Sequence, residues 1–335
     1  MFARGLLSAR RALARLRRAR LVALGGAAMG TTWSVRVAAR GTLDEASLRA
    51  AIEAELASVV AQMSPWEAAS DLSRYNRAEA GARCVLPPGF QEVLACALAM
   101  ARESDGAFDP TVGPLVDLWG FGPHGTRREP PPADDIASAR ARCGWWRLDL
   151  DATASVLCQP GGLALDLCSI AKGYAVDEIA RCLERHGCAD YLVEVGGELR
   201  ARGRRPDGLH WRVALEEPAS DASPAIVALD DGAIATSGDY YRYFDEGERR
   251  YSHTIDPRNG EPVAHGLACV SVAHSRAMSA DAYATALTVL GAETGYTFAV
   301  ERGIAARFVT RTRHGYERIQ TPAMAALMQG MILQE

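Results

Sequence analysis

The order of short strand-like segments in the second half of the chain constrains the fold more than any other feature. Runs of four to six residues, many apolar or β-branched, recur from residue 145 onward between turn residues, and only a few helical patterns interrupt them. The predicted strands are 145–150, 155–158, 163–167, 190–195, 211–215, 225–229, 251–255 and 268–273. Because strands and helices do not alternate strictly, this order favours an α+β (mixed α/β) fold with one continuous core over a doubly wound sheet.

Helical spacing of apolar residues predicts the remaining elements. In the clearest case Ile52, Leu56 and Val59 recur at turn spacing, and Ser64-Pro65 ends the pattern. The predicted helices are 43–63, 89–104 (ended by Ser104-Asp105-Gly106), 169–187 (closed by Gly187), 276–290 (closed by Gly291) and 322–331; a first strand is predicted at 29–38 and an exposed loop at 123–134.

The first 20 residues differ from the rest of the chain. They hold seven arginines and no acidic residue, and the apolar run 21–30 that follows is too short for a secretory h-region and has no nearby cysteine for a lipid. We therefore expect a basic, disordered or weakly helical tail over 1–20, followed by one domain over 21–335. No run of about 18 apolar residues exists, so no transmembrane segment is predicted.

Composition excludes several classes of function. A formal net charge of −4 gives no reason to expect nucleic-acid binding. The eight cysteines have no C-x-x-C spacing, so neither a disulfide framework nor a zinc cluster is indicated. A P-loop, a G-x-G-x-x-G fingerprint, an H-E-x-x-H motif and a G-x-S-x-G motif are also absent, so any nucleotide chemistry must be carried by other residues.

The segment DLCSIAKGYAVD, residues 166–177, is the first candidate site. We predict a strand that ends at Asp166, a polar turn, and a helix that begins near Ser169, whose N-terminal amides suit a phosphate. Lys172, in the first helical turn, is the only lysine of the chain. The alternatives are a plain strand-to-helix connection capped by Asp166 and an exposed lysine without function.

Two further candidates come from later strands. Gly196-Gly197, expected inside a strand, would allow close approach of a ligand or another backbone, and a β-bulge explains the pair equally well. His253 stands at a predicted strand end in polar company, before Ile255-Asp256-Pro257. Most lone histidines are structural, but one in this position is a candidate acid or base.

Asp281 and Thr285 are four residues apart and therefore share one helix face. A carboxylate and a hydroxyl are hard oxygen donors that suit magnesium better than zinc. The alternative is an ordinary first-turn acid and a packed threonine. We expect Asp281 to face the surface at the start of its helix.

In this order, the segments MGTTWSV at 29–35, DLCSIAKGYAVD, YSHTIDPRNGEPV at 251–263 and ADAYATAL at 280–287 resemble the ApbE family, the FAD:protein FMN transferases. The resemblance covers about three-quarters of the chain and implies a single ApbE-like domain with central, mostly antiparallel sheets flanked by helices. It departs at Cys168, where the family usually has Gly or Ser, and at Trp66, where a tyrosine is common.

The resemblance also implies residue roles. The FAD site would be lined by Met29, Trp66, Ala107, Phe108, Asp109, Asp166, Lys172 and Ile255. Magnesium would be held by Ser169, Asp281 and Thr285, and the catalytic residues would be Asp281 and His253, the latter assisting transfer.

The implied reaction is a phosphoryl transfer, in which a threonine hydroxyl of an acceptor flavoprotein subunit, from a redox complex or reductase, attacks the FMN phosphorus of FAD and AMP departs. Two other functions stay open: a magnesium-dependent FAD pyrophosphatase, and a protein that binds FAD without chemistry. The paired Asp281 and Thr285 speak against the last. We expect a cytoplasmic protein, with the periplasmic face of the inner membrane, common in the family, as the alternative.

Overall fold

The computed structural model describes residues 19–218, 225–240, 242–247 and 249–329. The predicted basic tail lies outside these residues, apart from its last two positions, and so do the last two residues of the predicted helix 322–331. Among the residues that the structure describes, no helix is both long enough and apolar enough to cross a membrane.

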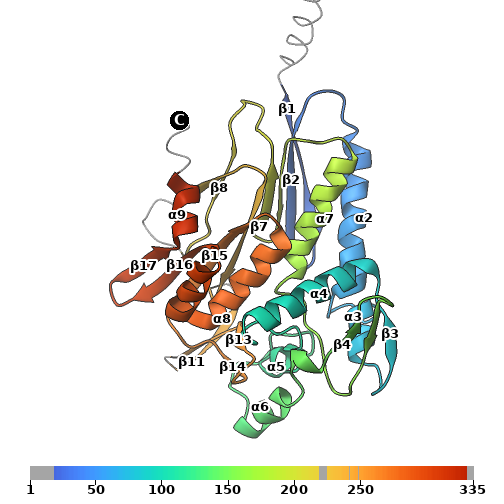
Figure 1. Cartoon of the computed structure of the whole chain (residues 1–335), viewed down its shortest axis with the longest axis vertical. Coiled ribbons are helices and arrows are strands. Elements are labelled where there is room, and N and C mark those ends of the chain that lie inside the picture. The colour runs from blue at the N-terminus through green and yellow to red at the C-terminus, as the bar shows by residue number, and fades with distance from the viewer. Residues whose placement is uncertain (1–18, 219–224, 241, 248, 330–335) are drawn as a thin grey trace, which may run out of the picture.

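An eight-stranded sheet forms the centre of the molecule (Figure 1). Its strands lie in the order β1-β2-β6-β7-β10-β15-β16-β17, and each neighbouring pair is antiparallel. Their bounds are β1 Arg20–Ala28, β2 Thr31–Ala39, β6 Tyr191–Val195, β7 Glu198–Arg202, β10 Gly232–Gly238, β15 Leu267–His274, β16 Ala305–Thr312 and β17 Gly315–Gln320. The predicted fold class, mixed helix and sheet with antiparallel pairing, is confirmed.

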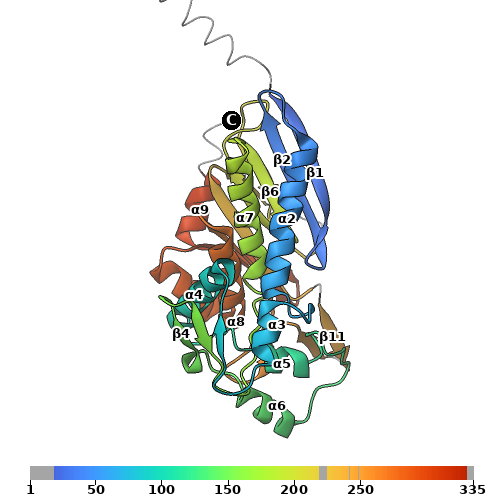
Figure 2. The ribbon, with the colours of Figure 1, turned by 90° about the vertical axis from the view of Figure 1, so that its right-hand side faces the viewer.

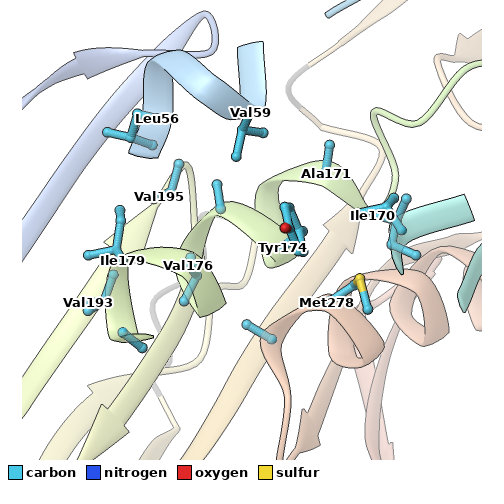
Figure 3. Close-up of a cluster of buried hydrophobic side chains, with 14 of the residues drawn as sticks. Leu56, Val59, Ile170, Ala171, Tyr174, Val176, Ile179, Val193, Val195 and Met278 are labelled. Carbon is cyan, nitrogen blue, oxygen red and sulfur yellow. The ribbon is translucent and has the colours of Figure 1, made fainter. Parts of the chain in front are cut away.

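Helices cover one face of this sheet. The main ones are α2 (Glu45–Met63), α4 (Pro88–Glu103), α7 (Ala171–Arg185) and α8 (Ala277–Glu301), and α2 and α7 lie side by side in Figure 2. Because strand side chains alternate between faces, β6 directs Val193 and Val195 toward these helices. Figure 3 shows them packed against α2, α7 and α8 in the main hydrophobic core.

The other face is covered by shorter elements. Leu192 of β6 and Ile234 of β10 point to this side and pack with β8 (Trp211–Ala214), β9 (Ile226–Leu229) and α9 (Pro322–Gln329). Smaller elements complete the chain: α3 Asp71–Asn76, β3 Arg83–Val85, α5 Gly113–Leu118, α6 Ala133–Arg140, a 3₁₀ turn Trp145–Arg147, β4 Asp149–Asp151, β5 Val156–Cys158, β11 Tyr243–Glu246, β12 Arg249–Ser252, β13 Ile255–Asp256 and β14 Glu261–Pro262.

Three local predictions were wrong. The apolar run 163–167 joins no sheet; instead Leu165 N–H donates to Asn76 Oδ1 (2.7 Å) and Asp166 N–H to the Pro110 carbonyl (2.8 Å). Over 145–150 the chain forms the 3₁₀ turn and only then β4. Residues 133–134, assigned to the loop 123–134, open α6. Gly291 does interrupt its helix as predicted, with a non-helical φ of 80° and ψ of 175°, but a second helical stretch follows it directly within α8.

Two further differences concern glycines. β1 was not expected, because its run of small residues, including Gly25 and Gly26, carries little strand signal. A Cβ on Gly26 would lie 2.8 Å from Trp33 Nε1, so glycine lets β1 lie close to β2. Gly196 and Gly197 are not inside a strand but form the two-residue turn between β6 and β7, with φ of 59° and 101°. Such a turn needs positive φ at both positions, which glycine adopts without strain.

Candidate active site

A cavity of about 460 Å³ opens where α7 and α8 meet the loops after β10 and β12. Its walls come from the β1–β2 turn, residues 107–109, the turn before α7, the end of β10, the segment 253–257 and α8. All the candidate residues line this one cavity: Met29, Trp66, Ala107, Phe108, Asp109, Asp166, Ser169, Lys172, His253, Ile255, Asp281 and Thr285. The structure thus brings them together, while their individual roles stay predictions.

The close crossing of α7 and α8 places the acidic end of the cavity. Gly173 allows it, because a Cβ there would lie 2.4 Å from the Ala277 carbonyl oxygen. Asp177 of α7 is fully buried and accepts the N–H groups of Ala277 and Met278, both at 3.1 Å, which fixes the start of α8. Asp281 follows one turn later, and its Oδ2 accepts the Gly173 N–H at 3.0 Å.

Asp281 is therefore not the surface-facing carboxylate that we expected. It is 3% exposed and reaches the solvent only through the cavity. Burial raises its pKa, against the opposing effects of Lys172 and the Gly173 N–H. The start of a helix faces the surface only when no second helix packs against it, and here α7 packs against the start of α8.

Lys172 is not an exposed first-turn lysine. Its side chain is 31% exposed, lines the cavity and pairs with Glu198, the first residue of β7. Burial alone would lower the pKa of Lys172, but the carboxylates of Glu198 and Asp281 outweigh burial and raise it, so the ammonium stays charged. Sequence reasoning missed Glu198, although the carboxylate directly after the Gly196-Gly197 turn was a signal that could have found it.

The turn before α7 differs from its prediction in detail. The helix begins at Ala171 and not near Ser169, and its N-cap Ile170 makes no side-chain cap. Asp166 does not cap the helix; its Oδ1 accepts the Cys168 N–H at 2.7 Å and closes a local turn. Burial raises the pKa of Asp166, although the Cys168 N–H opposes the shift.

His253 and Arg242 form the opposite wall of the cavity. The Arg242 carbonyl oxygen accepts the His253 backbone N–H (3.0 Å) and lies 3.1 Å from His253 Nδ1. Since a carbonyl only accepts, this contact favours the tautomer with the proton on Nδ1 and leaves Nε2 as an acceptor. Burial and the Arg242 charge lower the pKa of His253 to about 4. Arg242, whose guanidinium also donates to the Phe121 carbonyl, was another residue missed from the sequence.

Several residues with hydroxyl groups line the cavity together with Asp281. Thr285 Oγ1 lies 3.2 Å from Ser237 Oγ at the end of β10, and both residues line the cavity with Ser169. Within the described part of the chain, no group of three or more His, Cys, Asp or Glu side chains could hold a metal. A cation bound here would therefore have one carboxylate ligand, Asp281, and its other ligands would be hydroxyl, substrate and water oxygens.

The rim is more apolar. Trp66 is 52% exposed beside the cavity, while Ala107 and Phe108 are almost fully buried beneath it. Asp109 is 7% exposed and its Oδ1 accepts the backbone N–H (2.7 Å) and hydroxyl (2.6 Å) of Thr111. An exposed indole over a buried floor is a surface on which an aromatic ring can stack.

This fold is that of the flavin transferases. The apo crystal structure of the flavinyl transferase ApbE from Pseudomonas stutzeri superposes with a TM-score of 0.88 and 41% identity, over 93% of this chain and 98% of that one. The flavin transferase ApbE from Vibrio cholerae gives 0.86 and 34%, over 92% and 99%. The FAD:protein FMN transferase of Haemophilus influenzae is 35% identical over 92% of each chain. The ApbE family profile matches residues 29–308, and the chain belongs to the ApbE family.

Proposed function

We propose that this protein transfers the FMN half of FAD to a threonine hydroxyl of an acceptor flavoprotein, with release of AMP and with magnesium as the cofactor. The observation that supports this most strongly is the convergence of the candidate residues, from segments far apart in sequence, on one cavity. Its relatives are named for FMN transfer from FAD to protein.

The donors around Asp281 fit magnesium. They are a buried carboxylate and the hydroxyls of Thr285 and Ser169, all oxygens, and magnesium typically keeps several waters and phosphate oxygens besides one or two carboxylates. When bound, the ion would neutralise charge on the pyrophosphate. Lys172 and Arg242 bring further positive charge to the cavity wall.

The flavin nucleotide would be bound by the remaining wall. Met29, Trp66 and residues 107–109 offer apolar and aromatic surface, and Ile255 offers its backbone at the edge of β13. Asp166 would accept a hydrogen bond from the nucleotide. In this arrangement the pyrophosphate would lie nearest Lys172, because Lys172 places an ammonium group at the cavity wall in the first turn of α7.

The reaction itself is a displacement at phosphorus. The threonine oxygen forms a bond to the FMN phosphorus, and the bond from that phosphorus to the bridging oxygen breaks, so that AMP leaves with this oxygen. His253 Nε2 takes the hydroxyl proton. Its lowered pKa keeps the ring neutral at physiological pH, as a proton acceptor requires.

Incubation of the protein with FAD, magnesium and a threonine-bearing acceptor, followed by mass spectrometry of the acceptor, tests this function. The expected product is an acceptor heavier by the mass of FMN less one water, with AMP in equal amount. Free FMN and AMP with an unmodified acceptor would instead indicate a pyrophosphatase, and unchanged FAD would indicate a binding protein.

A further inference from the structure

Glu198 is a buried acid that the proposed reaction does not use. It follows the Gly196-Gly197 turn, which lies close to the Lys172 side chain: a Cβ on Gly196 would lie 3.4 Å from Lys172 Cδ. Glu198 is 1% exposed. Its Oε1 pairs with Lys172, and its Oε2 is buried with no hydrogen-bond partner among the residues described.

Two carboxylates compete for one ammonium here. Lys172 interacts electrostatically with both Glu198 and Asp281, but its ion pair is with Glu198. Asp281 has instead the neutral N–H of Gly173. A buried carboxylate without a positively charged partner is unfavourable. Without the charge of Glu198, the Lys172 ammonium would therefore turn toward Asp281. A divalent cation would then have to displace the ammonium from Asp281.

From this arrangement we infer that Glu198 is a positioning residue, which holds Lys172 away from Asp281 and so leaves the Asp281 carboxylate for a divalent cation. The inference rests on the proposed magnesium-dependent function. A purely structural role would make a different prediction: replacing Glu198 would change the stability of the fold but not the affinity for magnesium.

Burial raises the pKa of the Glu198 carboxyl to about 8, against the opposing charge of Lys172, so the carboxylate is fully charged only above that pH. Magnesium titration of the FAD-free protein by calorimetry, at a pH above this pKa, therefore separates these roles without measuring turnover. Glu198→Gln keeps the shape and an acceptor for Lys172 but removes the charge. We expect its dissociation constant for magnesium to rise about 10- to 100-fold, as for partners that orient metal ligands. Glu216→Gln is the matched control, because Glu216 also lines the cavity, with its Oε2 3.5 Å from the Cβ position of Gly197. It should bind magnesium nearly as the wild type does.

A second comparison tests whether Glu198 acts through the lysine. In a Lys172→Met background, Glu198→Gln should change magnesium affinity far less than it does alone. If Glu198→Gln does not fold, Glu198→Asp keeps the charge but shortens the reach to Lys172, and it should weaken magnesium binding too.

Wild-type affinity in Glu198→Gln, an equal loss in Glu216→Gln, or a full effect of Glu198→Gln without Lys172 would each overturn the inference. Failure of the wild type itself to bind magnesium without FAD would also overturn the inference, whereas the proposed function is tested separately by the transfer assay with FAD and magnesium.

Discussion

The two walls of the cavity are built in opposite ways. The helix wall, α7 and α8, belongs to the main core: Gly173, Asp177 and Asp281 are buried, and each of the two carboxylates accepts a backbone N–H of the other helix. The hairpin wall, residues 242–247 and 249–262, is held at the edge by stacked rings, with centroids 5.0 Å apart for Phe244 and Tyr251 and 5.6 Å apart for Trp119 and Tyr251.

The two walls also differ in the chemical roles proposed for their residues, cation binding on one and proton transfer on the other. Asp281 and Thr285, two of the three residues proposed for the cation, lie on the helix wall, where α7 and α8 cross closely, and Ser169 lies in the turn just before α7. The proposed proton acceptor lies on the hairpin wall, which is held by aromatic stacking, by the contact with the Arg242 carbonyl and by hydrogen bonds such as that from Trp119 Nε1 to the Gly260 carbonyl (2.9 Å). We therefore expect substitutions that remove a hydrogen bond of the helix wall to affect stability and activity together, and those on the hairpin wall to affect mainly activity.

The largest effect is expected for Asp281→Asn. The amide oxygen can still accept the Gly173 N–H, so the free energy of unfolding should change little, while loss of the charge should lower the transfer rate about a hundredfold or more. Rate measurements in excess magnesium and denaturant unfolding check this.

Asp281→Ala provides the contrast. It leaves the Gly173 N–H without an acceptor and should lower the free energy of unfolding by about 1–3 kcal/mol as well. Equal stability of the two variants would contradict the coupling of site and core on the helix wall.

His253→Ala should slow transfer about a hundredfold or more, the usual contribution of a general base. FAD affinity and the thermal midpoint should stay close to wild type, because the ring belongs to the hairpin wall. The exposed His314 between β16 and β17 gives the control His314→Ala, which should be silent. Equal loss of FAD binding would make His253 a binding residue.

The pH profile tests the same residue. The neutral ring accepts the proton, so activity should fall as pH decreases through the pKa of His253, at about 4 and not near 6.5. Arg242→Gln should move this limb to higher pH, because it removes a charge that opposes protonation. A limb that does not move would contradict the effect of the Arg242 charge on the pKa of His253.

Lys172→Ala should weaken FAD binding by about 1.5–3 kcal/mol, the range for a hydrogen bond to a charged group. Lys172→Arg should also be impaired, since the planar guanidinium cannot occupy the place of a compact ammonium between Glu198 and Asp281. Arg185→Lys, at the other end of α7, is the matched control and should be silent. A silent Lys172→Arg variant would show that only the charge at this position matters.

The smallest effect is expected for Phe244→Leu. It removes the stacking with Tyr251 and keeps apolar volume, at a cost of about 0.5–1.5 kcal/mol of stability. If the hairpin wall is held as described, the transfer rate should fall by a larger factor than FAD affinity does. Calorimetric FAD titration alongside rate measurement checks this.

The sequence was most informative where a local pattern decides the structure. The helix periodicity around Ile52 and Leu56 predicted α2 closely, and the strand-like run at 268–273 predicted β15 almost to its ends. The candidate residues could be identified as a set because the sequence motifs that carry the family resemblance occur in the expected order along the chain. None of this required knowledge of which elements touch.

Where tertiary contacts decide, the sequence was insufficient. The run 163–167 has the composition of a strand, yet its partners are the side chain of Asn76 and the carbonyl of Pro110, which no periodicity reveals. The burial of Asp281 depends on Gly173, 108 residues earlier in the chain. Glu198 was missed for the same reason, because its importance comes from Lys172 on a different element.

The crossing of α7 and α8 also has a consequence during synthesis. Asp177 accepts a hydrogen bond from Ala277, which lies 100 positions later in the chain. A nascent chain that has emerged only as far as β15 therefore contains α7 but not α8, and so lacks the contacts of Asp177 with Ala277 and of Gly173 with Asp281. Domains generally fold as units as they leave the ribosome. Under the proposed function, an incomplete chain therefore cannot consume FAD, and the flavin pool meets an active enzyme only after nearly all of it has been translated.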